Sequence, residues 1–415
     1  MRCEVVAVGT ELLLGQIVDT NSSWIGEQLA LAGIDSHYQT KVGDNEERML
    51  AVIGQAIERS DAVIITGGLG PTQDDITREV IARVKGVELE SRQHLVDKIE
   101  AMFGTRGRAM PQNNLRQAMV PIGGEPIPIQ PGTAPGLVVP IGDTIVYAVP
   151  GVPWEMKDMM SNFIIADIKE RAGITSIIRS RTLRTWGASE SGLSELLDDE
   201  IQRIDETNGA VTIAFLASGI EGLKVRLTAK AETEAEVDAL IADEEQRVRS
   251  IIGDRLIFGS DDETMEHVVL GLCRAQGLTL GLAESLTGGL IGSRITAGPG
   301  ASDVFRGSIV SYASEVKASI LGVDGTPDVS EETARVMARG ACSALGADVS
   351  VAVTGVAGPG AHDGQAAGTV FMATSVDGDI DVLEVNWPFD RERVRQFTTI
   401  TVLNQLRLRL IARAQ

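Results

Sequence analysis

A serine, a tyrosine and a lysine in the last third of the sequence have residue types suited to nucleophilic catalysis. Ser285 follows a short apolar stretch, and Tyr312 and Lys317 follow the next one. Neither motif contains a histidine, so a desolvated Lys317 is the expected proton acceptor in a Ser–Lys arrangement, with Tyr312 relaying or donating a proton. Backbone amides around Gly288 and Gly289 are the expected oxyanion donors. The cluster therefore predicts covalent catalysis by a serine.

The same three residues also fit a structural interpretation. Ser285 could cap the helix that follows it, Lys317 could be a solvated surface residue, and Tyr312 could pack its ring. On these residues alone, both interpretations stay open.

A glycine-rich loop followed by two acids forms a second cluster. Gly67, Gly68 and Gly70 come directly after a β-branched stretch, and Asp74 and Asp75 follow them. Glycines let the backbone approach a ligand closely, and the amides of a following helix N-terminus suit a phosphate. Adjacent carboxylates would repel that phosphate unless a divalent cation lay between them, so Asp74 or Asp75 is predicted to hold Mg²⁺ or a similar ion. The alternative is a helix capped by one of the acids, with the glycines merely turning the chain.

Two more loops belong beside this cluster, at 9–15 after the first predicted strand and at 130–136 before a later one. Loops at the strand ends of an open parallel sheet commonly form the ligand crevice. No Gly-x-x-x-x-Gly-Lys-[Ser/Thr] motif occurs, which excludes an ordinary P-loop NTPase. The further candidate substrate-binding residues on these loops and in the glycine-rich loop are Gly9, Thr10, Glu11, Thr72, Gly132 and Thr133.

The elements that must position these residues alternate between strand and helix patterns, which is typical of α/β folds. The first domain, 1–171, is expected to contain strands at 5–8, 62–66, 137–139 and 144–148 and helices at 21–32, at 75–85 and up to about 170. A small α+β domain, 172–258, is expected to contain strands at 179–185, 212–217 and 224–229 and helices at 189–203 and 232–252.

Residues 259–263 are a glycine, a serine and three acids, a composition typical of turns. They predict a linker into the third domain, 263–415. That domain is expected to contain strands at 279–283, 308–312, 349–353, 369–375 and 381–386 and helices at 267–276 and 330–344, and from 288 and 391 onward.

Composition narrows the function classes. The 415 residues are 43% hydrophobic with a formal net charge of −21, which suits packed domains and disfavours sequence-independent binding to nucleic acid or anionic membranes. Cys3, Cys273 and Cys342 lack Cys-x-x-Cys spacing, so neither a disulfide framework nor a structural zinc site is expected, and a reducing cytoplasm fits. The four histidines lack metal-ligand spacing, and no apolar run is long enough for a secretory signal or a membrane span.

The combination of loops resembles the competence/damage-inducible CinA family. The residues that carry the resemblance are Val8–Gly15 with Asp19–Asn21, Gly67–Thr72 with Asp74–Thr77, Pro131–Gly136, and Pro150–Met156. The family's N-terminal domain is similar to the molybdopterin-binding domain, a three-layer α/β fold. The resemblance implies a pyrophosphatase that uses Mg, Mn or Co to split ADP-ribose into AMP and ribose 5-phosphate. Gly67, Gly68 and Gly70 would hold the diphosphate, and Asp74 and Asp75 the metal.

The third domain matches the same family through Thr354–Gly360 and Gly368-Thr369. Its resemblance to nicotinamide mononucleotide (NMN) deamidase implies cofactor-free hydrolysis of NMN to nicotinic acid mononucleotide and ammonia, with Ser285 as nucleophile and Lys317 and Tyr312 as partners. Phe389 replaces a family glycine before Asp390-Arg391, and Ala366-Ala367 replaces Pro-Val, which affects substrate fit rather than chemistry. The implied substrate-binding residues are Thr287, Gly288, Gly289, Thr354, Gly355, Ala357, Gly358 and Arg391, the last on the substrate phosphate.

The middle segment fits the family's small KH-like domain. A role in RNA binding would need a basic face and a Gly-x-x-Gly loop. We expect neither, because Gly219 and Gly222 enclose an acid, Glu221, and we therefore expect a structural role and no nucleic-acid partner. The family also implies a homodimer.

Three functional interpretations follow: a bifunctional enzyme of pyridine-nucleotide salvage, an enzyme with one active domain, or a non-catalytic nucleotide- or pterin-binding scaffold in competence or DNA damage. Retention of both acids in the first domain, and of the serine and lysine in the third, favours an enzyme.

Overall fold

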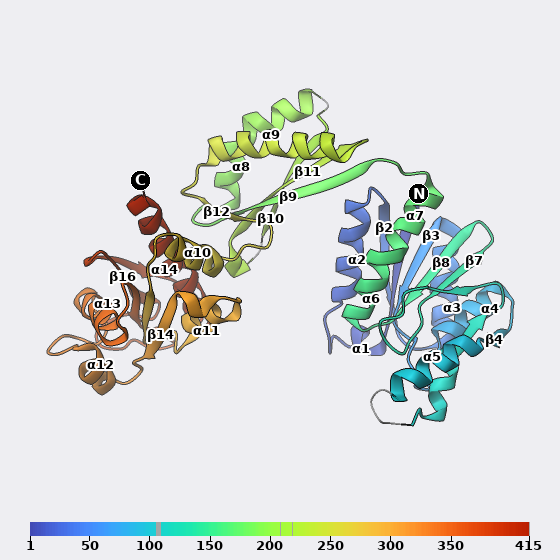
Figure 1. The fold of residues 1–415 in the computed structure, drawn as a ribbon, viewed down its shortest axis with the longest axis horizontal. Helices are drawn as coiled ribbons and strands as arrows, with labels where there is room; N and C mark the ends of the chain where they lie inside the picture. The colour runs from blue at the N-terminus through green and yellow to red at the C-terminus, as the bar shows by residue number, and fades with distance from the viewer. Residues whose placement is uncertain (105–108, 208, 218, 415) are drawn as a thin grey trace. The chain divides into compact units, whose positions relative to one another are not determined.

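The computed structural model describes residues 1–104, 109–207, 209–217 and 219–414, and these form two compact units (Figure 1). The first comprises Met1–Arg179 with Lys230–Val237, and the second Ser180–Ala229 with Asp238–Gln415.

The first unit is built on a mixed six-stranded sheet of order β2-β1-β3-β8-β7-β6. β1, β2, β3 and β8 are parallel, whereas β7 and β6 run antiparallel to their neighbours. The strands of this sheet and of a separate two-stranded ribbon are β1 Arg2–Val8, β2 Asp35–Val42, β3 Ala62–Thr66, β4 Leu89–Ser91, β5 Met119–Pro121, β6 Glu125–Pro126, β7 Leu137–Ile141 and β8 Thr144–Val149.

Helices cover both faces of this sheet, which gives three layers. Alternate residues of β3 serve the two faces: Ile64 packs in one core with α2 and α6, and Val63 and Ile65 pack in the other with α3, α4 and α5. The helical elements are α1 Thr10–Leu13, α2 Thr20–Leu31, α3 Glu46–Arg59, α4 Thr77–Lys85, α5 Gln93–Gly104, η1 Gln112–Ala118, α6 Pro153–Met159, the π-helical turn η2 Met160–Ile164, and α7 Ile165–Ala172.

The second unit begins with the KH-like part, a four-stranded sheet of order β10-β11-β9-β12 with two long helices. Its elements are β9 Ile177–Thr185, α8 Glu190–Glu206, β10 Val211–Ala217, η3 Gly219–Glu221, β11 Leu223–Ala231, α9 Glu234–Ile252 and β12 Ile257–Ser260. The expected linker therefore starts inside a strand, since Gly259 and Ser260 pair with β9.

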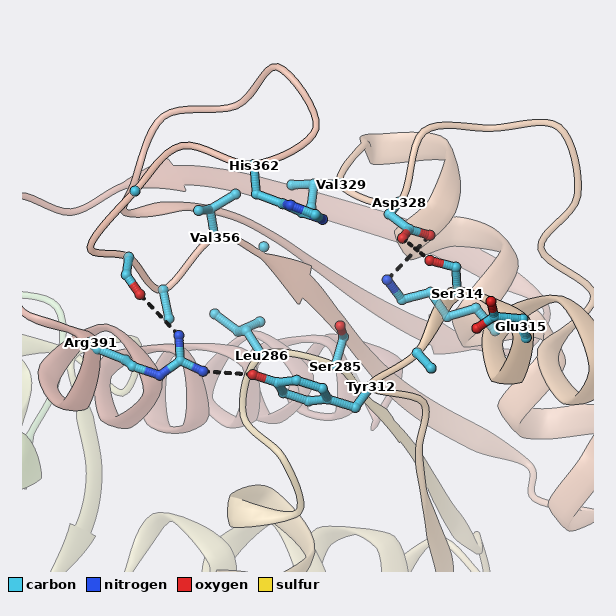
Figure 2. A pocket seen from close by; sticks show the side chains of 16 residues that line it. Ser285, Leu286, Tyr312, Ser314, Glu315, Asp328, Val329, Val356, His362 and Arg391 are labelled. Atoms are coloured by element: carbon cyan, nitrogen blue, oxygen red, sulfur yellow. Dashed lines mark hydrogen bonds and ion pairs between the residues drawn. The ribbon is translucent and has the colours of Figure 1, made fainter.

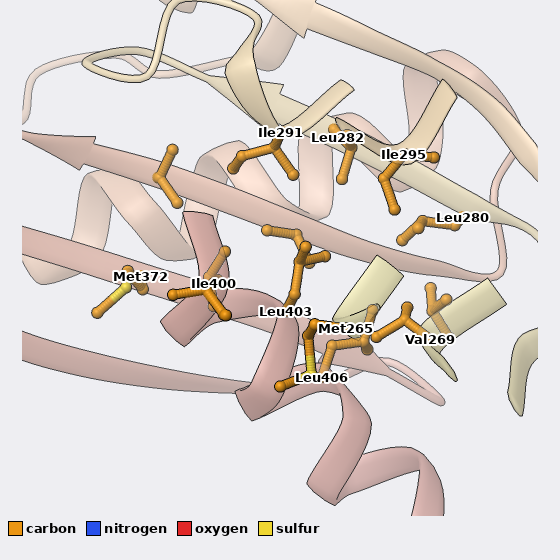
Figure 3. Close-up of a cluster of buried hydrophobic side chains, with 14 of the residues drawn as sticks. Met265, Val269, Leu280, Leu282, Ile291, Ile295, Met372, Ile400, Leu403 and Leu406 are labelled. Atoms are coloured by element: carbon orange, nitrogen blue, oxygen red, sulfur yellow. The ribbon is translucent and has the colours of Figure 1, made fainter. Parts of the chain in front are cut away.

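The C-terminal part of this unit is a five-stranded sheet of order β14-β13-β15-β16-β17, with the first three strands parallel and the last two antiparallel. One face packs on α10, α11 and α14, through the apolar cluster shown in Figure 3. The other face packs on α12 and α13. The elements are α10 Met265–Ala275, β13 Leu280–Glu284, α11 Leu290–Ala297, η4 Ala301–Asp303, β14 Phe305–Val310, α12 Ser314–Leu321, α13 Glu331–Leu345, β15 Val349–Gly355, β16 Thr369–Val376, β17 Asp379–Asn386 and α14 Arg391–Ala414.

Polar contacts join the KH-like part to the C-terminal part. Glu221 accepts from Arg294 on α11 at 2.7 Å, and Arg407 on α14 donates to backbone carbonyls of residues 254, 255 and 257. The rings of Trp186 and Phe397 lie 5.8 Å apart between centroids. The turn Gly219–Gly222 has the Gly-x-x-Gly spacing of nucleic-acid-binding KH loops, but its acid is engaged within the chain.

Candidate functional site

A pocket of about 470 Å³ lies in the C-terminal part of the second unit. Its walls are the segments that follow β13, β14 and β15, three neighbouring parallel strands whose carboxyl ends meet at one edge of the sheet. Figure 2 shows Ser285, Tyr312, Asp328, His362 and Arg391 around the same space. The lining residues are Ser285, Leu286, Tyr312, Ala313, Ser314, Glu315, Lys317, Asp328, Val329, Gly355, Val356, Ala357, Gly358, Gly360, His362 and Arg391.

Ser285 is the first residue after β13 and is 8% exposed. Its amide donates to the Val353 carbonyl at 3.0 Å, which ties the turn to the central strand β15. The serine does not cap α11, because the N-cap residue is Gly289, in a left-handed conformation with φ 93°.

Lys317, on α12, is buried rather than solvated, with its side chain 4% exposed. Its side-chain nitrogen lies 3.5 Å from Oδ1 of Asp328, and Ser314 donates to the other oxygen of that carboxylate. The Thr354 hydroxyl donates to the Asp328 backbone carbonyl at 2.7 Å and so fixes the loop that carries the acid. The lysine is therefore held at the pocket wall by a carboxylate.

Arg391 closes another side of the pocket. Its guanidinium donates to the Tyr312 hydroxyl at 2.6 Å and to the Gly358 carbonyl at 3.0 Å. Tyr312 is 61% exposed, so it does not pack its ring in a core. Within the described residues no carboxylate pairs with Arg391, so its positive charge is available to an anionic ligand.

The prediction that the amides of Gly288 and Gly289 bind an oxyanion is wrong. The Gly288 amide donates to the Ser285 carbonyl and the Gly289 amide to the Glu284 carboxylate, both at 3.0 Å, so neither is free. Ala357 and Gly358 line the pocket, and their amides meet no acceptor in the described part of the chain. They are better placed to bind an oxyanion.

The pocket differs from the predicted residue set in two further ways. Four predicted substrate-binding residues do not line it, namely Thr287, Gly288, Gly289 and Thr354, although Thr287 accepts a hydrogen bond from Arg395 at its carbonyl. His362 does line it, so the expectation that no histidine is available to Ser285 is wrong. His362 lies in the loop between β15 and β16, 77 positions from Ser285, and no sequence motif connects the two.

The first unit has a pocket of about 370 Å³ at the carboxyl ends of β1, β3 and β8. Its lining residues are Val8, Gly9, Glu11, Asp44, Gly67, Gly68, Leu69, Gly70, Pro71, Asp74, Asp75, Gln117, Thr133, Ala134, Pro150, Gly151, Val152 and Glu155. The three loops predicted to meet here do contribute, but Thr10, Thr72 and Gly132 stand outside the lining. Asp44, Gln117 and Glu155 were not predicted.

Only glycine fits at the start of the glycine-rich loop. Gly67 and Gly68 have φ 108° and 64°. A Cβ on Gly67 would lie 2.2 Å from the Val8 carbonyl oxygen, and a Cβ on Gly68 would lie 2.2 Å from the Thr77 hydroxyl. The amides of Gly68, Leu69 and Gly70 meet no acceptor among the described residues. Three consecutive free amides at a pocket wall suit the oxygens of a phosphate.

Asp75 precedes α4, which begins at Thr77 with Ile76 as its N-cap, so neither acid caps the helix as the alternative interpretation required. Asp75 accepts instead from the Thr72 amide at 2.8 Å and from the Thr72 hydroxyl. A Cβ on Gly70 would lie 2.4 Å from an Asp75 carboxylate oxygen, so this glycine lets the acid approach the loop.

The lining side chains of this pocket include five acids and no lysine or arginine. Burial raises the pKa of one of them, Glu155. Behind the loop, the buried Arg78 donates to the Leu69 carbonyl, and although burial lowers its pKa to about 10 it remains a cation at neutral pH. An anionic ligand in such a pocket requires a further cation.

The donor set fits a hard divalent ion held by few protein ligands. The described residues contain no cluster of three or more His, Cys, Asp or Glu arranged for a metal. Asp74 and Asp75 match the one or two carboxylates that Mg²⁺ takes beside substrate phosphates.

None of the helices in the described ranges has an apolar stretch that could span a bilayer.

Three family models match consecutive stretches of the chain: Probable molybdopterin binding domain at 4–170, Damage-inducible protein CinA KH domain at 180–259, and CinA C-terminal domain at 262–410. A CinA-like protein of Frankia casuarinae is 44% identical over 98% of this chain and 96% of its own length. A CinA-like protein of Dictyoglomus thermophilum is 38% identical over 99% of this chain and 100% of its own length.

Among solved structures, the protein CinA with unknown function from Thermoplasma acidophilum is 32% identical, covers 41% of this chain and 98% of its own, and has a TM-score of 0.37. The competence-damaged protein (CinA) superfamily protein from Escherichia coli is 33% identical, covers 36% and 92%, and has a TM-score of 0.34. With two full-length relatives well above 30% identity and three domain models in the same order, the chain belongs to the CinA family of competence/damage-inducible proteins.

Proposed function

We propose that the C-terminal pocket hydrolyses the carboxamide of NMN to nicotinic acid mononucleotide and ammonia. The carrying observation is that Ser285, a buried Lys317 paired with Asp328, and an arginine without a carboxylate partner line one pocket. The anionic group bound by Arg391 is the phosphate of the mononucleotide, and the Ser285 hydroxyl is the nucleophile.

The steps balance without a cofactor. The Ser285 oxygen attacks the carboxamide carbon while its proton passes to the neutral amine of Lys317, and Asp328 stabilises the ammonium that forms. The amides of Ala357 and Gly358 bind the oxyanion. Lys317 returns the proton to the leaving nitrogen, ammonia departs, and water then hydrolyses the acyl-serine.

The pocket of the first unit supports a second activity, metal-dependent hydrolysis of ADP-ribose to AMP and ribose 5-phosphate. The free amides of the glycine-rich loop would bind the diphosphate, and Asp74 and Asp75 would hold a divalent ion. When bound, such an ion would supply the positive charge that offsets the acids of the pocket wall. Gly67 and Gly68 lack a Cβ, which allows the glycine-rich loop to pack against the end of β1 and the start of α4.

One assay separates these activities from a purely binding role. Purified full-length protein is incubated with NMN or with ADP-ribose, with and without divalent metal or EDTA, while ammonia and nucleotide products are measured. We expect ammonia from NMN in every condition, and AMP from ADP-ribose only with metal. Absence of both reactions would favour the nucleotide- or pterin-binding scaffold, and one reaction alone would leave a single active domain.

A further inference from the structure

The buried carboxylate of Glu284 lies beside the proposed nucleophile and has no role in the mechanism described above. Glu284 ends β13, directly before Ser285, and is fully buried. One of its oxygens accepts from the amides of Gly289 and Ile291, both at 3.0 Å. The other accepts from the Gly292 amide at 2.9 Å and from the Ser308 hydroxyl at 2.8 Å.

These contacts occupy the start of α11. The first amides of a helix have no partner inside the helix, and a negative charge there is stabilised by the helix dipole. Gly289, the N-cap residue, has no side chain to satisfy them. A carboxylate from the preceding strand does so instead, so α11 is bonded to the end of β13 across the turn that carries Ser285.

The turn between the two ends is short and is tied by three hydrogen bonds. The Ser285 amide donates to β15, the Gly288 amide donates back to the Ser285 carbonyl, and Arg395 on α14 donates to the Thr287 carbonyl at 2.6 Å. Removing the Glu284 carboxylate would free one end of the turn only. The Ser285 backbone is bonded through its amide to β15 and through its carbonyl to the Gly288 amide, so we expect the direction of its hydroxyl to depend on both ends of the turn.

We propose that Glu284 is a positioning residue: by filling the amides of α11 it fixes the Ser285 turn in reactive geometry and keeps substrate anions off that helix end. The proposal rests on Ser285 being the reacting group. An error of about 1 Å in a reacting atom costs up to roughly a hundredfold in rate, so loss of the carboxylate should lower kcat more than it changes KM.

The test uses the full chain with Glu284→Gln, Glu284→Ala and the milder Ser308→Ala, which removes one donor to the carboxylate. Ser350→Ala is the control. The Ser350 hydroxyl is buried and donates to the Ala338 carbonyl at a distance of 2.6 Å, and Ser350 does not line the pocket. We expect kcat for NMN to fall about tenfold or more in both Glu284 variants, with KM within about twofold, less in Ser308→Ala and not at all in Ser350→Ala. Sodium formate, compared with NaCl at equal ionic strength, should raise both Tm and kcat of Glu284→Ala but not of the unchanged protein.

A second readout does not need NMN turnover: the rate at which a fluorophosphonate labels Ser285, followed by mass spectrometry, should fall in the Glu284 variants and recover with formate. If the unchanged protein is labelled but does not deamidate NMN, the proposed substrate is wrong while the positioning role is still measured. If kcat and the labelling rate are unchanged in both Glu284 variants, Glu284 only caps the helix and the proposal is wrong. The same conclusion follows if formate raises Tm but not kcat. Failure of Ser285 to be labelled in the unchanged protein would also overturn the proposal.

Discussion

Ser285 must lose a proton to become a nucleophile, and the pocket offers two acceptors with different surroundings. Lys317 is buried against Asp328, whereas His362 lies in the exposed loop after β15. A carboxylate stabilises the lysine after it has taken the proton and orients its nitrogen beforehand. We therefore assign the proton transfer to Lys317.

Ser285→Ala and Lys317→Ala should each lower NMN turnover by about 10²-fold or more, and the double variant should be little worse than either, because residues that act as one unit are not additive. Tyr312→Phe should cost less, since Arg391 still donates to the Gly358 carbonyl. Steady-state kcat measurements decide this. Near-normal turnover of Ser285→Ala would point to a directly activated water, and a large loss in His362→Gln alone would move the base to His362.

The acids of the first pocket can be tested independently. Asp75→Asn should remove metal-dependent ADP-ribose cleavage, because an amide can still accept from Thr72 but no longer carries the charge that holds a cation. NMN deamidation should not change. Asp61→Asn, which alters an acid paired with Arg2 in the same unit and outside the pocket, is the control. Metal-dependent cleavage that survives in both Asp74→Asn and Asp75→Asn would contradict the metal assignment.

The sequence brought some site residues together correctly and missed others for a physical reason. Ser285 and Tyr312 follow the parallel strands β13 and β14, and Gly355 ends β15, so all three lie at the carboxyl-end edge of the sheet. Asp328 lies between two helices and His362 in the loop after β15, so only the folded chain places them. Ser285 with Gly288 and Gly289 suggested free amides at the start of α11. The buried carboxylate at the end of β13 accepts hydrogen bonds from the amides there.

At the scale of elements, the sequence patterns identified most strands and helices but missed some of both kinds, and the unanticipated strands are β2, β4, β5, β6 and β12. The β-branched run 62–66 coincides with β3, whereas α3, α5 and the α12 helix that carries Lys317 were not anticipated. α4 begins two residues later than expected, because Asp75 is held by Thr72 instead of starting the helix. A local hydrogen bond outside the helix thus displaced its start.

The pair of helices in the KH-like part contains a titrating acid. Glu244 on α9 is buried beside Glu200 and Arg203 on α8, and burial first, then Glu200, raises its pKa to about 7. A carboxyl whose folded-state pKa is raised stabilises the fold below its usual pKa and loses that contribution as pH rises through about 7.

Glu244→Gln should therefore raise Tm relative to the unchanged protein at pH 8 and make little difference at pH 5. Asp243→Asn, an exposed acid on the same helix, should show no such pH-dependent difference. Thermal unfolding between pH 5 and pH 8.5 measures both. A Tm difference for Glu244→Gln that does not change with pH would contradict the prediction.

At the scale of the whole molecule, the two candidate sites lie in different compact units, each with its own cores. We propose the domain limits 1–171, 172–258 and 263–415, with the C-terminal domain able to fold alone. The contacts of Arg294, Arg407 and Phe397 indicate what such a fragment would lose.

A fragment from Asp261 to Gln415 should fold and deamidate NMN, and a fragment from Ser180 should do the same with Tm higher by roughly 5 °C or more. The shorter fragment leaves the buried Arg407 without the carbonyls of residues 254, 255 and 257. Calorimetry with ammonia assays compares the two. An inactive short fragment beside an active long one would mean that the KH-like part contributes to the pocket.

The guanidinium of Arg391, which has no carboxylate partner among the described residues, affects how fast a ligand associates. It is a local positive spot on a chain of net charge −21, so an anionic nucleotide approaches against the field of the whole protein and is attracted only at short range. Added salt screens the long-range repulsion more strongly than the contact, because the Debye length falls to about 10 Å at 0.1 M ionic strength. Stopped-flow binding should therefore show an association rate constant that rises with ionic strength while the dissociation rate constant also rises, the reverse of the electrostatic steering seen in oppositely charged partners.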